Sequence, residues 1–215
     1  MADEMVHVTL ANSVVVPQVG YDVYQVPQDE CERCVRDALE VGYRHIDTAQ
    51  SYFNEGQVGA AVAASGVDRA DMFLTTKVWL VHYGEGATRA SVEDSLRKLR
   101  TDYLDLVLLH QPFGDAYGAW RDLVRLYEEG KVRAIGVSNF YVDRMVEFCE
   151  FNDVQPMVNQ METHPLNQQA ELMAWEERYR VQPEVWAPSA RGAADSSRTP
   201  RLLRSAPRTA RARPR

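Results

Sequence analysis

The sequence predicts an α/β protein, an incomplete (β/α)8 barrel with about seven strands that lacks the eighth strand and the last helices. Short β-branched runs alternate with amphipathic stretches of about a dozen residues, which is the pattern of a parallel sheet with crossover helices. A doubly wound sheet begins in the same way. The number of repeats and the polar residues at the strand ends favour the barrel.

Each expected element has a local signal in the sequence. Residues 104–110 form a nearly continuous apolar run, which indicates a strand buried on both faces. Gly42 and Gly130 end two of the helices, and Thr88 or its neighbour is a suitable N-cap for a third. The expected strands are residues 17–21, 44–47, 72–78, 104–110, 132–138, 156–160 and 184–187. The expected helices are residues 28–41, 54–64, 88–100, 116–129, 142–151 and 168–178.

Charge is distributed unevenly along the 215-residue chain, whose formal net charge is −7. Residues 189–215 hold eight Arg and one Asp, whereas residues 1–188 carry 16 basic and 30 acidic side chains. This acidic body argues against a nucleic-acid partner. No run approaches the roughly 18 apolar residues of a membrane helix, and the acidic N-terminus is unlike a secretory signal. We therefore expect a cytoplasmic protein without a membrane partner, and a monomer.

The composition changes at residue 189. Residues 189–215 hold three prolines and no aromatic residue, so we expect a barrel domain over 1–188 and a disordered tail over 189–215. Two interpretations of the tail stay open: a natural basic tail that binds anions, and the truncated or frame-shifted end of a longer protein. The second is preferred, because a barrel strand without its neighbour exposes a row of unpaired backbone groups.

The three cysteines, Cys31, Cys34 and Cys149, fit a reducing compartment better than a disulfide framework. The Cys31-x-x-Cys34 spacing can hold a metal. Both cysteines lie on an expected helix, however, and no second pair of ligands follows. A structural role is favoured, and no metal is expected.

Four polar residues at the carboxyl ends of three successive expected strands form the candidate catalytic group: Asp47, Tyr52, Lys77 and His110. Taken singly, each has an ordinary structural explanation, as a cap, a surface charge or a core histidine. In a parallel barrel they would be neighbours. A buried Lys77 needs the opposite charge that Asp47 supplies, and the cation would lower the pKa of Tyr52 from about 10 toward that of a working proton donor. His110 would orient the same carbonyl oxygen.

Five strings at these strand ends resemble the aldo-keto reductases, in the order HIDTAQSYFNE, TTKVW, LLHQP, GVSNF and NQMETHP. The similarity is greatest to small bacterial members like the 2,5-didehydrogluconate reductases, and it extends from about Val6 to Pro188. The resemblance implies a (β/α)8 barrel that uses NADPH, and no metal, to reduce aldehydes or ketones to alcohols.

The resemblance also implies roles for individual residues. Asp47, Tyr52, Lys77 and His110 match the catalytic tetrad, in which Tyr52 is the general acid, Lys77 and Asp47 tune it, and His110 orients the substrate. The residues that match cofactor-binding positions are Asp47, Ser138, Asn139, Gln160 and Trp186. The residues that match substrate-pocket positions are Tyr24, Trp79 and Phe113. Core packing is the alternative for each aromatic residue, and for Trp186 the two interpretations are nearly equal.

The sequence departs from the family in two places. Gly20-Tyr21-Asp22 stands where the family usually has a Gly-x-Gly turn close to the cofactor, and the Asp22 carboxylate either weakens dinucleotide binding or only reshapes the turn. The family's loop after the seventh strand, its basic segment for the adenosine 2′-phosphate and its closing helix have no counterpart. The alternative function is therefore a catalytically inactive truncated barrel, either a binding or interaction protein or an unstable fragment. The sequence itself names neither the carbonyl substrate nor the choice of NADP over NAD.

Overall fold

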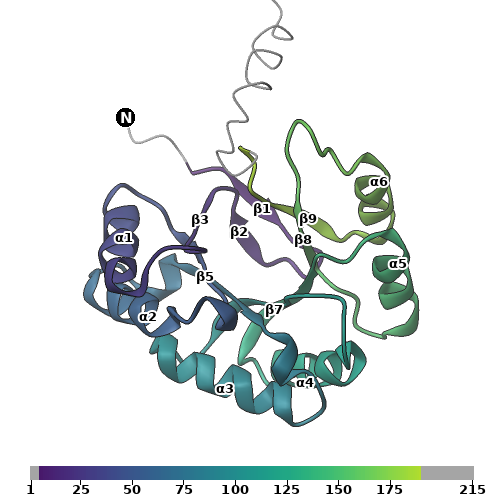
Figure 1. Ribbon diagram of the computed structural model, residues 1–215, viewed down its shortest axis with the longest axis horizontal. Helices are drawn as coiled ribbons and strands as arrows, with labels where there is room; N and C mark the ends of the chain where they lie inside the picture. The colour runs from purple at the N-terminus through teal and green to yellow at the C-terminus, as the bar shows by residue number, and fades with distance from the viewer. Residues whose placement is uncertain (1–4, 190–215) are drawn as a thin grey trace, which may run out of the picture.

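The computed structural model describes residues 5–189, in which a parallel sheet curls into most of a barrel (Figure 1). The strands are ordered β3-β4-β5-β6-β7-β8-β9, and every neighbouring pair is parallel. They are β3 (Gly20–Asp22), β4 (His45–Asp47), β5 (Phe73–Val78), β6 (Leu104–Leu109), β7 (Val132–Ser138), β8 (Val158–Glu162) and β9 (Gln182–Trp186). The prediction of an incomplete (β/α)8 barrel is confirmed, with β3 and β9 as the two edges of the sheet.

Within residues 5–189, six α-helices lie outside the sheet and form an arc around it (Figure 1). They are α1 (Gln28–Glu40), α2 (Glu55–Ala64), α3 (Ala87–Leu99), α4 (Ala116–Glu128), α5 (Val142–Phe151) and α6 (Ala170–Tyr179). Each helix connects one strand of the sheet to the next, which is the alternation that a β/α barrel requires. In the described part of the chain, no helix covers the side of the arc between α1 and α6 (Figure 1).

Close packing between the layers explains several sequence features. Every residue of β6 is buried, as the apolar run over 104–110 predicts, and every residue of β5 is buried as well. Helices α2 and α3 approach each other at Gly59, where an added Cβ would lie only 2.2 Å from the carbonyl oxygen of Lys98. Helix α4 begins at Asp115, whose side chain accepts a hydrogen bond of 2.8 Å from the Gly118 amide.

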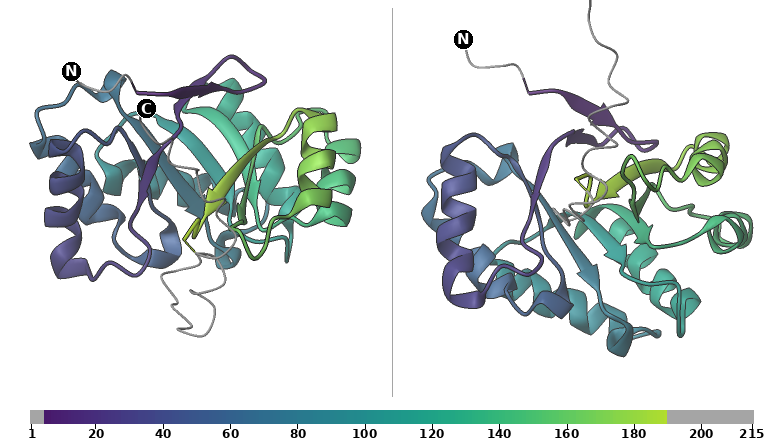
Figure 2. Two further views of the ribbon diagram at one scale, coloured as in Figure 1. Left: turned by 90° about the horizontal axis from the view of Figure 1, so that it is seen from above. Right: turned by 45° about the horizontal axis from the view of Figure 1, so that its top comes forward.

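An antiparallel hairpin, which the sequence pattern does not predict, precedes the barrel. Strand β1 (His7–Thr9) pairs with β2 (Val15–Pro17), and the chain reverses near Ser13, whose φ is 69°. The prediction of a first strand over 17–21 is wrong in its bounds, because this range includes the last residue of β2 and the first two residues of β3. The Asn12 side chain donates a hydrogen bond of 2.9 Å to the carbonyl oxygen of Arg133, at the start of β7. The hairpin therefore lies across the amino ends of the barrel strands (Figure 2).

The other expected elements agree with the structure within a few residues at each end. The largest differences are in β8 and β9, which cover residues 158–162 and 182–186 where 156–160 and 184–187 were expected. Pro156 has no amide hydrogen to pair and lies before β8. Pro183 is tolerated inside β9, because within the described residues this strand pairs with β8 alone and its other side needs no hydrogen-bond donor.

Some expectations lie outside the described residues. Of the predicted tail over 189–215, the structure describes only Ser189, so the division at residue 188 stays a prediction. No helix within residues 5–189 is long and apolar enough to span a bilayer. In the same range no cluster of His, Cys, Asp and Glu could hold a metal ion. Cys31, Cys34 and Cys149 are free thiols.

Candidate active site

Parallel pairing gathers polar side chains at the carboxyl end of the strands. In the register of the sheet, Asp22 at the end of β3 lies opposite Asp47 at the end of β4, and Gln160 of β8 lies opposite Glu184 of β9. Lys77 stands near the end of β5. His110 comes directly after β6, and its amide donates to the Val78 carbonyl oxygen. The strands therefore bring together residues that are more than a hundred positions apart in the sequence.

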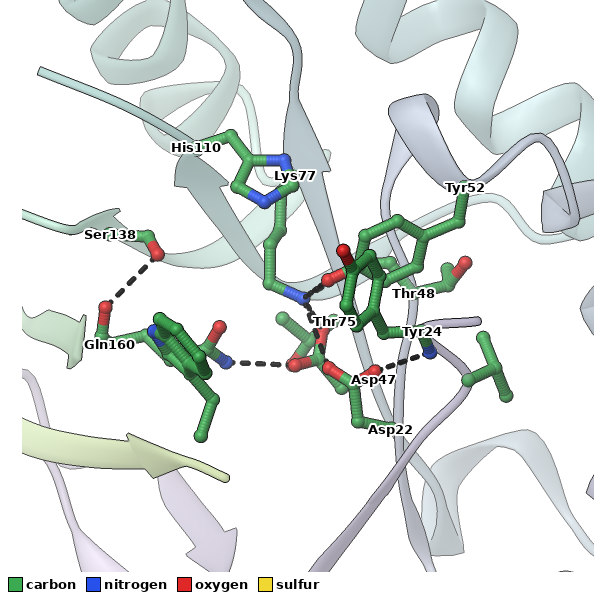
Figure 3. A network of polar contacts seen from close by, with 12 residues as sticks. Asp22, Tyr24, Asp47, Thr48, Tyr52, Thr75, Lys77, His110, Ser138 and Gln160 are labelled. Atoms are coloured by element: carbon green, nitrogen blue, oxygen red, sulfur yellow. Dashed lines mark hydrogen bonds and ion pairs between the residues drawn. The ribbon is translucent and has the colours of Figure 1, made fainter. Parts of the chain in front are cut away.

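The Lys77 amine is the centre of the site and points toward the Tyr52 phenol (Figure 3). Its Nζ lies 2.6 Å from Asp47 Oδ1, 3.3 Å from the Tyr52 hydroxyl oxygen and 3.5 Å from Asp22 Oδ2. It also donates to the Thr48 carbonyl oxygen at 3.2 Å. Only 1% of the Lys77 side chain is exposed, so the cation depends on these partners for its solvation.

A short loop after β4 holds Tyr52 in place. The 3-10 helix η1 (Gln50–Tyr52) ends at Phe53, whose φ of 59° reverses the chain. The next residue, Asn54, is fully buried; it accepts a hydrogen bond of 2.8 Å from Thr48 Oγ1 and donates one of 3.0 Å to the Val23 carbonyl oxygen. These contacts tie the loop to the two strands beside it and thereby fix the direction of the phenol.

His110 completes the group of four. Its ring lies edge-on to both Tyr52 and Trp79, with centroid separations of 5.8 Å and 5.1 Å. The Ser51 hydroxyl lies 3.4 Å from His110 Nδ1. The structure thus brings together all four residues of the predicted catalytic group, Asp47, Tyr52, Lys77 and His110.

Burial and charge set the protonation of these groups. Burial alone would lower the pKa of Lys77, but the carboxylates of Asp47 and Asp22 raise it above its ordinary value, so the amine is charged. Burial, followed by the Lys77 cation, lowers the pKa of His110 to about 3, so the ring is neutral. Burial raises the pKa of Asp47, against the opposing effect of Lys77.

The pKa of Tyr52 differs from the one that the sequence predicts. The Lys77 cation was expected to lower the pKa of this phenol toward neutral pH. In the structure, burial outweighs Lys77, and Asp22 and Asp47 add to the effect of burial, so the pKa of Tyr52 is raised above its ordinary value. The phenol therefore holds its proton at neutral pH.

The four other predicted cofactor residues line one wall beside this group. Ser138 Oγ donates to the Gln160 carbonyl oxygen at 3.0 Å. Asn139 Nδ2 donates to Ser138 Oγ and to the His110 carbonyl oxygen, both at 3.1 Å, and Trp186 Nε1 donates to Asn139 Oδ1 at 3.3 Å. Gln160 Nε2 donates to Asp47 Oδ2 at 2.8 Å, which joins this wall to the lysine (Figure 3).

The three predicted substrate-pocket residues are placed differently. Tyr24 packs against Tyr52 with ring centroids 5.0 Å apart, and Trp79 packs against His110. Both line a cavity of about 900 Å³ together with the predicted catalytic and cofactor residues other than the buried Lys77. Phe113 is 63% exposed and does not line this cavity.

Two acidic residues belong to the site beyond the predicted set. Asp22, which stands where the family usually has a glycine of the turn, lines the cavity beside Lys77. Glu184 accepts a hydrogen bond of 2.6 Å from Gln160 Nε2. The sequence contains a signal for Glu184. Alternate residues of a strand point to the same side, so Glu184 lies on the same face as Trp186, which was predicted to belong to the site.

Comparison with known proteins gives the class of this barrel. The sequence profile of the aldo/keto reductase family matches residues 18–210, and the chain belongs to that family. Methylglyoxal reductase DkgA of Salmonella typhimurium is 41% identical over 188 residues, which cover 86% of this chain and 68% of that one.

Two solved structures place the match in three dimensions. The crystal structure of a putative 2,5-diketo-D-gluconic acid reductase B is 39% identical, has a TM-score of 0.84, and matches over 90% of this chain and 69% of that one. The Bombyx mori aldo-keto reductase in complex with NADP is 30% identical, has a TM-score of 0.82, and matches over 86% of this chain and 67% of that one. The chain thus spans about two thirds of the length of these relatives.

Proposed function

We propose that this chain reduces aldehydes or ketones to alcohols with NADPH, and that Tyr52 is the general acid. The observation that carries the proposal is the distance of 3.3 Å between Lys77 Nζ and the Tyr52 hydroxyl, at the wall of a cavity that His110 also lines. A protonated phenol, a fixed cation and a neutral imidazole are the groups that a carbonyl oxygen needs as it becomes an alkoxide.

The cavity residues fit the nicotinamide half of the cofactor. The Ser138 hydroxyl and the Asn139 and Gln160 amides offer the donors and acceptors with which a carboxamide pairs, and Trp186 offers a flat ring. A volume of about 900 Å³ lies within the usual range for small-molecule sites. NADPH, when bound, would supply the hydride that adds to the carbonyl carbon.

The chain's own residues would handle the proton. Tyr52 keeps its proton until the carbonyl oxygen becomes basic, and then donates it. The phenolate left behind would lie beside the Lys77 cation, which stabilises it. His110 is neutral and can donate a ring N–H to the same oxygen, which orients the carbonyl without competing as an acid. Asp47 would hold the lysine charged and in position.

The experiment that tests this proposal measures NADPH oxidation by the purified chain. Methylglyoxal is the first substrate to assay, because the Salmonella relative bears its name; glyceraldehyde is the second. Tyr52→Phe should lower kcat by about 100-fold or more. Tyr141→Phe, at an exposed tyrosine away from the cavity, is the matched control and should keep full activity.

A separate titration of NADPH fluorescence measures cofactor binding. A folded chain that binds NADPH and reduces no carbonyl compound would refute the proposal, as would full activity in Tyr52→Phe. The carbonyl substrate, the cytoplasmic location and the monomeric state stay predictions.

A further inference from the structure

Asp22 is a cavity residue that has no direct part in the proposed proton transfer, although its charge acts on Lys77 and Tyr52. It ends β3, and its Oδ2 lies 3.5 Å from Lys77 Nζ, beside the shorter contact that Asp47 makes (Figure 3). Its other oxygen accepts a hydrogen bond of 2.5 Å from the Tyr24 amide, which fixes the direction of the carboxyl group. About a third of the Asp22 side chain, 34%, is exposed, and this residue lines the cavity.

The cavity is rich in acidic groups. Among the described residues, its lining includes the carboxyl groups of Asp22, Asp47 and Glu184 and no Lys or Arg. The two histidines in the lining, His45 and His110, add no positive charge, because burial lowers the pKa of both. Lys77 is the cation that faces these acids, and it lies almost wholly beneath the cavity surface.

We propose that Asp22 determines the charge of the accepted substrate, so that the site selects uncharged and cationic carbonyl compounds over those that carry a carboxylate. This inference rests on the proposed function and specifies its substrate class. A carboxylate on the substrate would meet Asp22 as a like charge in a partly desolvated space and would find no guanidinium or ammonium group in the lining to pair with. A cationic group would meet a favourable charge at the same place.

Lys77 does not cancel this effect. Its ammonium already lies between Asp47 and Asp22, within 2.6 Å and 3.5 Å of their oxygens, and it also donates to Thr48. It is therefore committed to groups of the protein. Asp22, in contrast, is 34% exposed and lines the cavity.

Three aldehydes of one shape test the proposal: benzaldehyde, para-carboxybenzaldehyde and para-trimethylammoniobenzaldehyde. The variants are Asp22→Asn, which keeps an acceptor for the Tyr24 amide, and Asp71→Asn, which removes the same charge at an exposed position outside the cavity. The assays run at about pH 8, because burial followed by Asp47 raises the pKa of Asp22 to about 7.

In the unchanged chain, kcat/KM should be lowest for the anionic aldehyde. Asp22→Asn should raise kcat/KM for the anion relative to benzaldehyde on the order of tenfold and lower it for the cation relative to benzaldehyde. Asp71→Asn should change neither ratio. Equal ratios in the unchanged chain and in Asp22→Asn would overturn the proposal.

A binding measurement separates this proposal from the proposed function. Dissociation constants of the three corresponding benzyl alcohols can be read from quenching of tryptophan fluorescence, because Trp79 and Trp186 line the cavity. Absence of turnover with every aldehyde would refute the proposed function alone. If the alcohols then bound with a charge preference that Asp22→Asn removed, the role of Asp22 would stand. If that preference were absent, or unchanged in Asp22→Asn, the role would be refuted.

Discussion

Glu176, a carboxyl group buried in α6, should make the stability of this protein depend on pH. Only 1% of its surface is exposed, and its Oε1 accepts a hydrogen bond of 2.8 Å from Asn159 Nδ2. Burial raises the pKa of Glu176 from 4.5 to about 7, although the Asn159 hydrogen bond opposes that rise. Between these two pH values the folded chain keeps the proton and the unfolded chain loses it. The free energy of unfolding should therefore fall as pH rises through this window.

The size of the effect follows from the two pKa values. The difference between 4.5 and about 7, at about 1.36 kcal/mol for each pH unit, corresponds to about 3 kcal/mol. Glu176→Gln keeps an acceptor for Asn159 and cannot ionise. The variant and the unchanged chain should differ little near pH 4.5, whereas at about pH 8 the variant should be more stable by up to about 3 kcal/mol.

Urea denaturation followed by circular dichroism, at several pH values from about 5 to about 8, measures this difference. Glu177→Gln, at the exposed neighbouring position, is the matched control and should show no such trend. A gain in Glu176→Gln that is the same at every pH would refute the reasoning, because it would come from packing and not from ionisation. No gain at about pH 8 would refute it as well.

Three further predictions concern charge, packing and the site. Asp105→Asn should destabilise the chain by about 1.5–3 kcal/mol in urea denaturation, because it removes the charged partner of two partly exposed arginines, whereas Asp94→Asn, whose two partners are largely exposed, should cost at most about 1 kcal/mol. Gly59→Ala should cost about 1–3 kcal/mol in the same assay, and Gly56→Ala, which meets nothing within 4 Å, should cost nothing. The carbon-13 signal of His110 Cε1 should stay constant from about pH 5 to about pH 9, and a titration near its ordinary pKa would contradict a buried neutral ring.

The barrel strands and the catalytic group could be predicted from the sequence because polar residues mark the ends of mostly apolar strands. Residues 104–109 are mostly apolar, and the polar His110 that follows them then stands at a strand end. Asp47 and Lys77 lie near the ends of neighbouring strands in the same way. Because parallel strands place their carboxyl ends together, local strand assignments were enough to predict which side chains meet.

Other features depend on contacts that a local pattern does not contain. Strands β1 and β2 are three residues each, too short for alternation to stand out, and the hairpin is held by a contact between Asn12 and a residue 121 positions away. The pKa of Tyr52 is raised, whereas the sequence predicts that it is lowered. The direction of the shift depends mainly on how deeply the phenol is buried, and the sequence alone does not show that depth. Phe113 follows β6 but turns toward solvent.

The site is divided between strands that differ in how firmly they are held. Lys77 lies in β5 and His110 directly follows its neighbour β6, and both strands are paired on both sides and buried throughout. Asp22 and Glu184 stand on β3 and β9, each of which is paired on one side alone within residues 5–189. Local opening of a fold starts where pairing is weakest. Such opening would move Asp22 and Glu184 and leave Lys77 and His110 in place. Substitutions along the two edges should thus alter ligand binding while Lys77 and His110 keep their positions.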